Sequence, residues 1–284
     1  MPRPIVSPSL LAADISRLGA DASAALAAGA DWLHCDIMDG NAVENLTFGP
    51  PVVACLHAAL PAAFLDCHLM VSDPGAYVAR LAAAGAGGVT FHVEGRDGAA
   101  CAAVAAAVRG AGLRCGLALS PSTPAEAAFV LADAGAVDML LCMTVEPGWG
   151  GQPFNDSVLA KVAALRKRNP NIDIQVDGGI GPATVGKAAA AGANVVVAGS
   201  SVFGTKDLAA AISGLRAALV AAQTACYAAG EEHSEAADLK FTLPLPGAAL
   251  LSRNLAATRV GAERCVFTAP TRQLDVASFV DLFL

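Results

Sequence analysis

The sequence is most informative in two short stretches, Trp32-Leu33-His34-Cys35-Asp36-Ile37-Met38 and Asp66-Cys67-His68-Leu69-Met70. Both are apolar runs in which every second residue can bind a metal, and side chains two residues apart on a strand share one face. A third run, 172–177, ends in a carboxylate before two glycines. A single His or Asp at a strand end is more often a turn former, but here residue type, parity and position agree. The three runs therefore predict one metal site, formed by His34, Asp36, His68 and Asp177.

Working outward from these runs, apolar stretches alternate with alanine-rich helical patterns between residues 4 and 223. The expected strands are 4–9, 31–37, 63–69, 88–92, 113–119, 137–143, 172–177 and 194–199. Eight such units predict an α/β protein, a (β/α)8 TIM barrel with parallel strands, whose catalytic groups lie at the carboxyl ends of the strands. An open doubly wound sheet is the alternative. It is disfavoured because no G-x-G-x-x-G motif follows the first strand.

Composition excludes some classes of function. A net charge of −7 and a pI near 5.1 disfavour a nucleic-acid surface. No uninterrupted stretch of about 18 strongly apolar residues is present, so no membrane span is expected. The chain enters a predicted strand at residue 4, which leaves no room for a signal peptide. The eight cysteines include no C-x-x-C pair and are expected to be reduced, as in a cytoplasmic protein.

Three glycine-containing segments follow the last three predicted strands: 146–152, 177–181 and 198–201. Glycines allow several backbone N–H groups to converge on an anion, and this is where barrels commonly hold phosphate. Any one of these segments could be an ordinary tight turn. Together they predict a phosphorylated ligand.

At these residues the chain resembles the ribulose-phosphate 3-epimerase family, in order from about residue 4 to 220. The matching segments are Ser7-Pro8-Ser9-Leu10-Leu11-Ala12-Ala13-Asp14, His34-Cys35-Asp36-Ile37-Met38-Asp39-Gly40, Asn45-Leu46-Thr47-Phe48-Gly49-Pro50, Asp66-Cys67-His68-Leu69-Met70-Val71, Met143-Thr144-Val145-Glu146-Pro147-Gly148-Trp149-Gly150-Gly151-Gln152 and Asp177-Gly178-Gly179-Ile180. The resemblance implies a metal-dependent isomerase of the pentose phosphate pathway. Such an enzyme interconverts D-ribulose 5-phosphate and D-xylulose 5-phosphate by two-base proton transfer at C3 through an enediolate.

The resemblance also implies roles for individual residues. Asp36 corresponds to the proton acceptor and Asp177 to the proton donor, and both are among the family's ligands for one divalent cation (zinc, iron, manganese or cobalt) together with the two histidines. The positions that match substrate contacts are Ser9, His68, Gly148, Trp149, Gly150, Gly151, Gly178, Gly179, Gly199 and Ser200. The expected partners are a pentulose phosphate and further copies of the chain, but neither nucleic acid nor a membrane.

Two features depart from the family pattern. Residues 41–45 are Asn-Ala-Val-Glu-Asn, where the family usually has His-Phe-Val-Pro-Asn in a loop over the barrel mouth. The chain also continues past the usual end of the fold. We expect an epimerase domain at 1–223 and a C-terminal extension at 224–284 of unknown structure and role, with a solvated linker at 231–235 and apolar segments at 239–251 and 276–284.

Two other functions remain open on the sequence. A hexulose-phosphate 3-epimerase, acting for example on allulose 6-phosphate, would use the same ligands. A non-catalytic barrel that binds a sugar phosphate would need none of the four metal and acid–base positions together, and their joint presence disfavours it.

Overall fold

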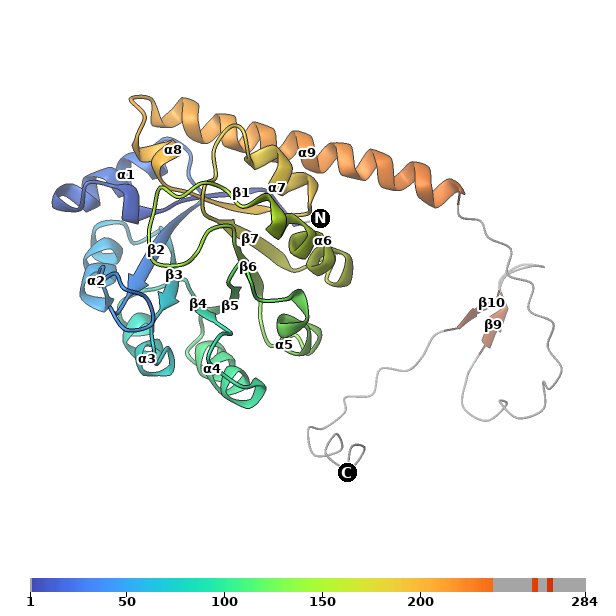
Figure 1. The fold of residues 1–284 in the computed structure, drawn as a ribbon, viewed down its shortest axis with the longest axis horizontal. Helices are drawn as coiled ribbons and strands as arrows, with labels where there is room; N and C mark the ends of the chain where they lie inside the picture. The colour runs from blue at the N-terminus through green and yellow to red at the C-terminus, as the bar shows by residue number, and fades with distance from the viewer. Residues whose placement is uncertain (1, 237–256, 260–264, 268–284) are drawn as a thin grey trace. The chain divides into compact units, whose positions relative to one another are not determined.

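The computed structural model describes residues 2–236, 257–259 and 265–267. Eight parallel strands form one sheet in the order β1-β8-β7-β6-β5-β4-β3-β2. The strands are β1 (Ile5–Pro8), β2 (Trp32–Met38), β3 (Phe64–Met70), β4 (Gly88–His92), β5 (Arg114–Leu119), β6 (Met139–Met143), β7 (Asp173–Asp177) and β8 (Val195–Ala198). Helices surround these strands in Figure 1. The predicted (β/α)8 barrel is confirmed, and every strand lies within two residues of its expected bounds.

The barrel closes along the seam between β1 and β2. Ser9 and His34 form a parallel bridge there. Lower on the same seam, the backbone N–H of Val6 donates to the Asp31 carboxylate over 2.8 Å, and the Asp31 N–H donates to the Val6 carbonyl over 3.0 Å. The seam brings the end of β1 beside the first of the two metal-binding runs.

Each strand is followed by helical structure. The helical elements are η1 (Leu10–Ala12), η2 (Ile15–Arg17), α1 (Leu18–Ala27), α2 (Pro50–Ala59), α3 (Gly75–Ala83), α4 (Gly98–Gly110), η3 (Ala125–Ala128), α5 (Phe129–Asp133), η4 (Asp156–Val158), α6 (Leu159–Arg168), α7 (Val185–Ala190), α8 (Ser200–Phe203) and α9 (Leu208–Ala236). Several predicted helices begin as a short 3-10 turn. One reason is local capping: the Asp14 side chain accepts from the Ser16 N–H over 3.0 Å at the start of η2.

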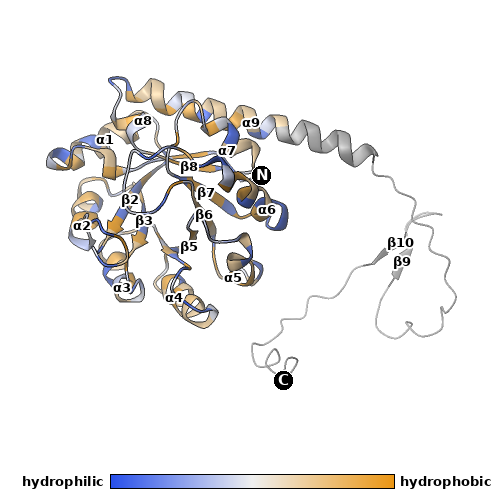
Figure 2. Ribbon diagram, in the orientation of Figure 1, coloured by the Kyte–Doolittle hydropathy of each residue, from blue (hydrophilic) through white to orange (hydrophobic). Residues whose placement is uncertain are grey.

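Two of the apolar clusters in the core show how the barrel is packed. The main core lies between the outer face of the strands and the helices, and it includes the outward-facing thiols of Cys35, Cys67 and Cys142. Inside the barrel, Ile5, Trp32, Met139 and Val195 form a separate apolar cluster at the amino ends of the strands. Figure 2 shows apolar residues along β2 and β3 and hydrophilic turns on α6. The amino end of the barrel is therefore plugged, and polar groups gather toward the other end.

Helix α9 packs on the barrel. Its buried residues Ile212, Leu215 and Leu219 recur at helical spacing and belong to the main core. By length and composition alone, the window Leu208–Ala225 could also cross a membrane. Only 22% of this window is buried, so packing of the stripe on the barrel does not by itself explain the apolar character, and the absence of membrane association stays a prediction.

The structure corrects one expectation for the C-terminal region. Residues 231–235, predicted to be a linker, continue the helix α9. Three of these five residues are glutamate, which favours helix, and no proline interrupts the stretch. The chain divides into two compact units, Met1–Ser234 and Glu235–Leu284. The second contains an antiparallel pair, β9 (Ala257–Arg259) and β10 (Cys265–Phe267). The predicted apolar segments 239–251 and 276–284 lie outside the described residues.

Candidate active site

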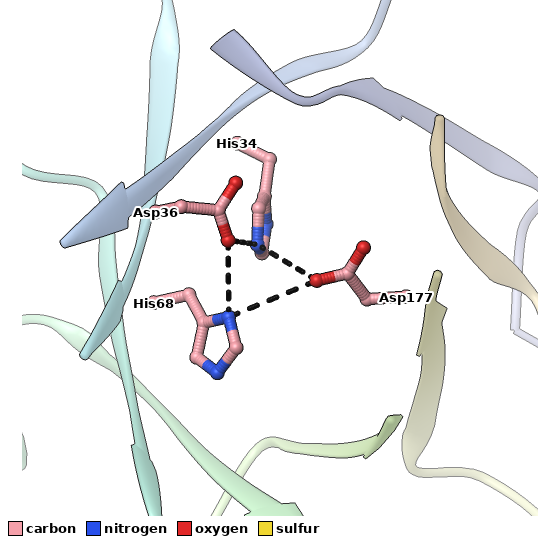
Figure 3. A group of neighbouring side chains, drawn as sticks. All are labelled: His34, Asp36, His68 and Asp177. Carbon is pink, nitrogen blue, oxygen red and sulfur yellow. Dashed lines mark hydrogen bonds and ion pairs between the residues drawn. The ribbon is translucent and has the colours of Figure 1, made fainter. Parts of the chain in front are cut away.

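Four side chains meet at the carboxyl ends of β2, β3 and β7, and we call them the His–Asp cluster: His34, Asp36, His68 and Asp177. One potential ligand atom from each lies within 4.8 Å of the others. Asp36 Oδ1 is 3.3 Å from His34 Nε2 and 3.4 Å from His68 Nδ1. Asp177 Oδ2 is 3.7 Å and 3.8 Å from the same two nitrogens. Figure 3 shows the two carboxylates reaching in from opposite sides, with the imidazoles between them.

The His34 ring is held from behind by a carboxylate. Its Nδ1 lies 2.9 Å from Asp66 Oδ2, which also accepts from the Gln175 side-chain amide over 2.7 Å. An ionised carboxylate only accepts, so Nδ1 donates its proton to Asp66. Burial acts to lower the pKa of His34, but the charges of Asp36 and Asp66 raise it well above its usual value, so in the metal-free protein Nε2 also carries a proton, which a bound cation would displace. This Nε2 is buried and has no hydrogen-bond partner among the residues that the structure describes. A buried, unpartnered imidazole nitrogen facing two carboxylates fits a divalent cation.

The His68 ring is held from behind by a second histidine. Its Nδ1 faces the cluster, while its Nε2 lies 2.9 Å from His92 Nε2. His92 Nδ1 in turn lies 2.9 Å from Glu94 Oε2. Both metal-facing imidazoles thus have a polar partner on the far side of the ring.

The two carboxylates of the cluster have opposite electrostatic surroundings. Burial acts to raise the pKa of Asp36, but the charge of His34 and then the neighbouring His68 imidazole lower it far below its usual range. For Asp177, burial and then the Asp36 charge raise the pKa to about 7. Ser9 Oγ also donates to Asp36 Oδ2 over 2.6 Å. In the metal-free protein, one carboxylate is ionised and the other holds a proton near neutral pH.

A cavity of about 690 Å³ opens beside the cluster, and we call it the larger cavity. Asp36 and Asp177 line it, while Met38, Met70 and Met143 form apolar parts of its wall. The lining also contains most of the positions predicted to contact substrate: Ser9, Gly148, Trp149, Gly150, Gly151, Gly178, Gly179, Gly199 and Ser200. His68, predicted for both roles, is fully buried and does not line this cavity. It reaches the site through Nδ1 alone.

The glycines after β7 are required by local geometry. Gly178 has φ 118° and Gly179 has φ 63°, in the left-handed region that other residues rarely adopt. A Cβ on Gly178 would lie 2.4 Å from Val145 Cγ2, and one on Gly179 would lie 2.5 Å from the Phe154 backbone nitrogen. The backbone therefore approaches its neighbours, and the cavity, closely enough to present its own N–H groups.

The unusual loop at 41–45 is tied down by hydrogen bonds. Asp39 Oδ1 accepts from the N–H groups of Asn41 and Ala42, each over 2.8 Å. Asn45 reaches across the mouth, and its Nδ2 donates to the Gly148 carbonyl over 2.9 Å. The loop over the mouth is thus linked to the glycine segment after β6, although it lacks the proline and the aromatic residue of the usual pattern.

Sequence reasoning missed the outer partners of the cluster. Asp66 was placed on the inward face of its strand but given no role, and Gln175, His92 and Glu94 were not singled out. A signal existed for two of them. His92-Val93-Glu94 repeats, at the end of β4, the alternation of polar groups seen in the two metal-binding runs.

The fold and the site define a class of protein: a TIM barrel with two carboxylates and two imidazoles gathered in one His–Asp cluster at the carboxyl ends of its strands. The family model described as the ribulose-phosphate 3-epimerase family matches residues 5–203. The chain belongs to this family and is an isomerase of the epimerase type.

Individual relatives agree with the family. A ribulose-phosphate 3-epimerase, cytoplasmic isoform, of Oryza sativa subsp. japonica is 48% identical over 220 residues, which cover 77% of this chain and 95% of that protein. A ribulose-phosphate 3-epimerase of Mycobacterium tuberculosis is 45% identical, covering 75% and 92%. Among solved structures, a 3-keto-L-gulonate-6-phosphate decarboxylase from Vibrio cholerae aligns with a TM-score of 0.59 at 20% identity, covering 78% and 99%. That likeness shows the shared barrel alone.

Proposed function

We propose that the protein interconverts D-ribulose 5-phosphate and D-xylulose 5-phosphate by two-base proton transfer at C3, with one divalent cation in the His–Asp cluster. One observation carries the proposal: Asp36 and Asp177 approach the cluster from opposite sides, with pKa values shifted in opposite directions. The family membership supports the same activity.

Inversion at C3 requires removal of a weakly acidic proton beside the C2 carbonyl and delivery of a proton to the opposite face. A single base tends to return the proton to the side it left, whereas two carboxylates on opposite sides do not. Asp36, held ionised by the neighbouring imidazoles, is suited to accept the proton. Asp177, which retains its proton near pH 7, is suited to deliver a proton to C3 of the enediolate from the other face, which gives the epimeric ketose.

The residues that would hold the cation are the four of the His–Asp cluster. Two neutral imidazoles and two carboxylates suit zinc, iron, manganese or cobalt rather than calcium or magnesium, which prefer oxygen ligands. When bound, such a cation stabilises negative charge on the substrate oxygens as a Lewis acid. The protein's own contribution is to aim Nε2 of His34 and Nδ1 of His68 at the site.

The phosphate group is assigned to the glycine segments on the β6–β8 side of the larger cavity. Their N–H groups offer donors without long side chains, and Gly178 and Gly179 adopt conformations that allow close approach. The same segments would accept a hexulose phosphate only if the cavity holds one more carbon.

A coupled epimerase assay on metal-analysed protein tests the proposal. We expect about one divalent cation per chain, turnover of ribulose 5-phosphate, and loss of most activity with a chelator followed by recovery on adding metal. Allulose 6-phosphate, assayed in parallel, is expected to be the poorer substrate. Full activity in metal-free protein would refute the metal role, and binding of the sugar phosphate without turnover would favour a non-catalytic barrel.

Three further expectations remain proposals. The domain boundary is placed at residue 223, although α9 continues to Ala236. Assembly into a homo-oligomer can be measured by light scattering. A cytoplasmic location, like that named for the rice relative, can be checked by fractionation.

A further inference from the structure

His68 is separated from the nearest outer carboxylate by one complete imidazole. The His68 and His92 rings are tilted by only 22° with centroids 5.0 Å apart, and their Nε2 atoms are 2.9 Å apart. Two nearly coplanar rings that meet at one nitrogen each form a hydrogen bond along their edges. One nitrogen must donate and the other must accept.

The carboxylate of Glu94, at the far end of this series of hydrogen bonds, decides which nitrogen donates. Glu94 Oε1 accepts from the backbone N–H of Ser120 over 2.7 Å and from the Thr123 hydroxyl. These bonds and the one from His92 outweigh the effect of burial and hold the pKa of Glu94 at about 2, so it is a carboxylate that only accepts. Its Oε2 therefore accepts from His92 Nδ1–H. His92 Nε2 is left as an acceptor. The proton of the shared bond lies on His68 Nε2 because the competing contact, from His68 Nδ1 to Asp36 Oδ1, is longer at 3.4 Å.

We propose that Glu94 and His92 are positioning residues that hold the proton of His68 on Nε2 and so keep Nδ1 free as a lone pair toward the His–Asp cluster. The inference rests on the proposed metal-dependent function and adds a specific set of outer residues to it. Each imidazole of the cluster is then oriented by an outer carboxylate. Asp66 binds the His34 ring directly, and Glu94 acts on the His68 ring through His92.

The position of the pair separates this role from contact with substrate. Neither His92 nor Glu94 lines the larger cavity. Both line a second cavity of about 340 Å³, with Ser72, Arg96 and Ser120. The Arg96 guanidinium donates four hydrogen bonds, all to backbone carbonyls of the cavity wall, so it is held in place by the wall itself. The pair therefore acts on the cluster from behind and not on the bound sugar.

The substitution Glu94→Gln makes a sharp test because the Ser120 N–H can only donate. The amide oxygen must face Ser120, which turns the amide NH2 toward His92 Nδ1. His92 then becomes a donor at Nε2, and the His68 proton is displaced to Nδ1, where it faces the metal position. Glu94→Asp keeps an acceptor-only group at the same place and should retain more function. Glu126→Gln, at an exposed position in η3, is the matched control for loss of one charge.

The experiment measures zinc affinity by competition with a chromophoric chelator on the full chain, together with kcat and KM. We expect Glu94→Gln to weaken zinc binding about 10–100-fold and to lower kcat at saturating zinc. KM should stay within about threefold of wild type, because Glu94 makes no direct contact with the substrate that the substitution would remove. Glu94→Asp should lose less, and Glu126→Gln nothing. Thermal melts of the metal-free variants check folding.

Long-range ¹H–¹⁵N spectra of histidine-labelled protein report the proton order directly. His68 should carry its proton on Nε2 in metal-free wild type and on Nδ1 in Glu94→Gln. If wild type binds zinc and epimerises but the folded Glu94→Gln variant binds zinc as tightly, the positioning role is refuted while the proposed function stands. If wild type holds no metal, the proposed function fails, and a spectrum with His68 protonated on Nδ1 would refute the proton order independently.

Discussion

The two sides of the barrel mouth are built in different ways. On the β2–β3 side, the functional groups are side chains that project from within strands, and His34 and His68 are fully buried. On the β6–β8 side, the groups that we propose to hold the phosphate are backbone N–H groups in glycine segments that follow the strands, and Trp149 there is 58% exposed. Asp177, at the last position of β7, lies at the boundary between the two sides.

This difference follows from what each side has to do. Acid–base and metal chemistry need groups with shifted pKa values in one geometry, and burial within a sheet supplies both. Holding a phosphate needs several N–H donors around one anion, and flexible glycine backbone supplies these without bulky side chains. Five predictions test this division, from the largest expected effect to the smallest.

The carboxylates should carry the largest effect. Asp36→Asn and Asp177→Asn are each expected to lower kcat by about 10⁴-fold, at the upper end of what a placed acid or base contributes. Because each carboxylate serves one face, each variant should retain exchange of the C3 proton with solvent for one epimer only. The exchange is followed by NMR in ²H₂O, with metal content measured alongside. Normal turnover in either metal-loaded variant would contradict the two-base mechanism.

Removing the phosphate tests the other side of the mouth. Free ribulose should react with a kcat/KM lower than that of ribulose 5-phosphate by about 10³-fold, because several charge-assisted bonds to backbone donors are lost together. Steady-state kinetics on both sugars decide this. Comparable efficiency on the free sugar would mean that the glycine segments do not bind phosphate.

The pH dependence of metal binding tests the raised pKa of Asp177, the residue between the two sides of the mouth. Asp177 has a pKa raised to about 7 in the metal-free protein, so below pH 7 a binding metal must displace its proton. Below pH 7, release of the Asp177 proton should therefore make zinc affinity rise by about tenfold per pH unit. Above pH 7, Asp177 should add no further increase. Competition titrations between pH 5.5 and 8 should give a smaller slope for Asp177→Asn. An equal slope in both proteins would show that Asp177 binds no proton there.

A methyl group at Gly178 should affect the β6–β8 side alone. With φ 118° and Val145 Cγ2 at 2.4 Å, Gly178→Ala is expected to destabilise the protein by about 1–3 kcal/mol and to raise KM about tenfold. Gly186→Ala in α7 is the matched control, because a Cβ there meets nothing within 4 Å. Zinc affinity should be unchanged in both variants. A Gly178→Ala protein with normal KM would separate this glycine from substrate binding.

Truncation should have the smallest effect. A chain ending at Gln223 retains the buried residues Ile212, Leu215 and Leu219 of α9 and every residue that lines the larger cavity. Its kcat and KM should stay within about twofold of those of the full chain, since distant sites act independently. Circular dichroism and the coupled assay measure this. Loss of turnover in a soluble, cooperatively folded chain would mean that residues after 223 contribute to the active site.

The amino-acid sequence alone determined the barrel and the identity of the His–Asp cluster. Strand parity is a local property with a period of two, so His34 and Asp36 could be placed on one face from their spacing. The helix-to-strand joints are equally local: Gly29 and Gly85, which follow α1 and α3, adopt the left-handed region with φ 101° and 86°. The exact bounds of the strands and helices did not follow from the sequence: Trp32–Met38 ends one residue later than expected, and several helices start with 3-10 turns.

Only the tertiary structure decided what stands behind the cluster. The bond from Gln175 to Asp66 joins residues 109 positions apart, and the bond from His68 to His92 depends on the register of β3 and β4. No local pattern contains such pairs, since each forms only when barrel closure sets the neighbours of every strand. The same closure brings Asp36 and Asp177 to opposite sides of one cluster and separates their pKa values. Residue types therefore fix which groups can do the chemistry, and long-range packing sets their protonation.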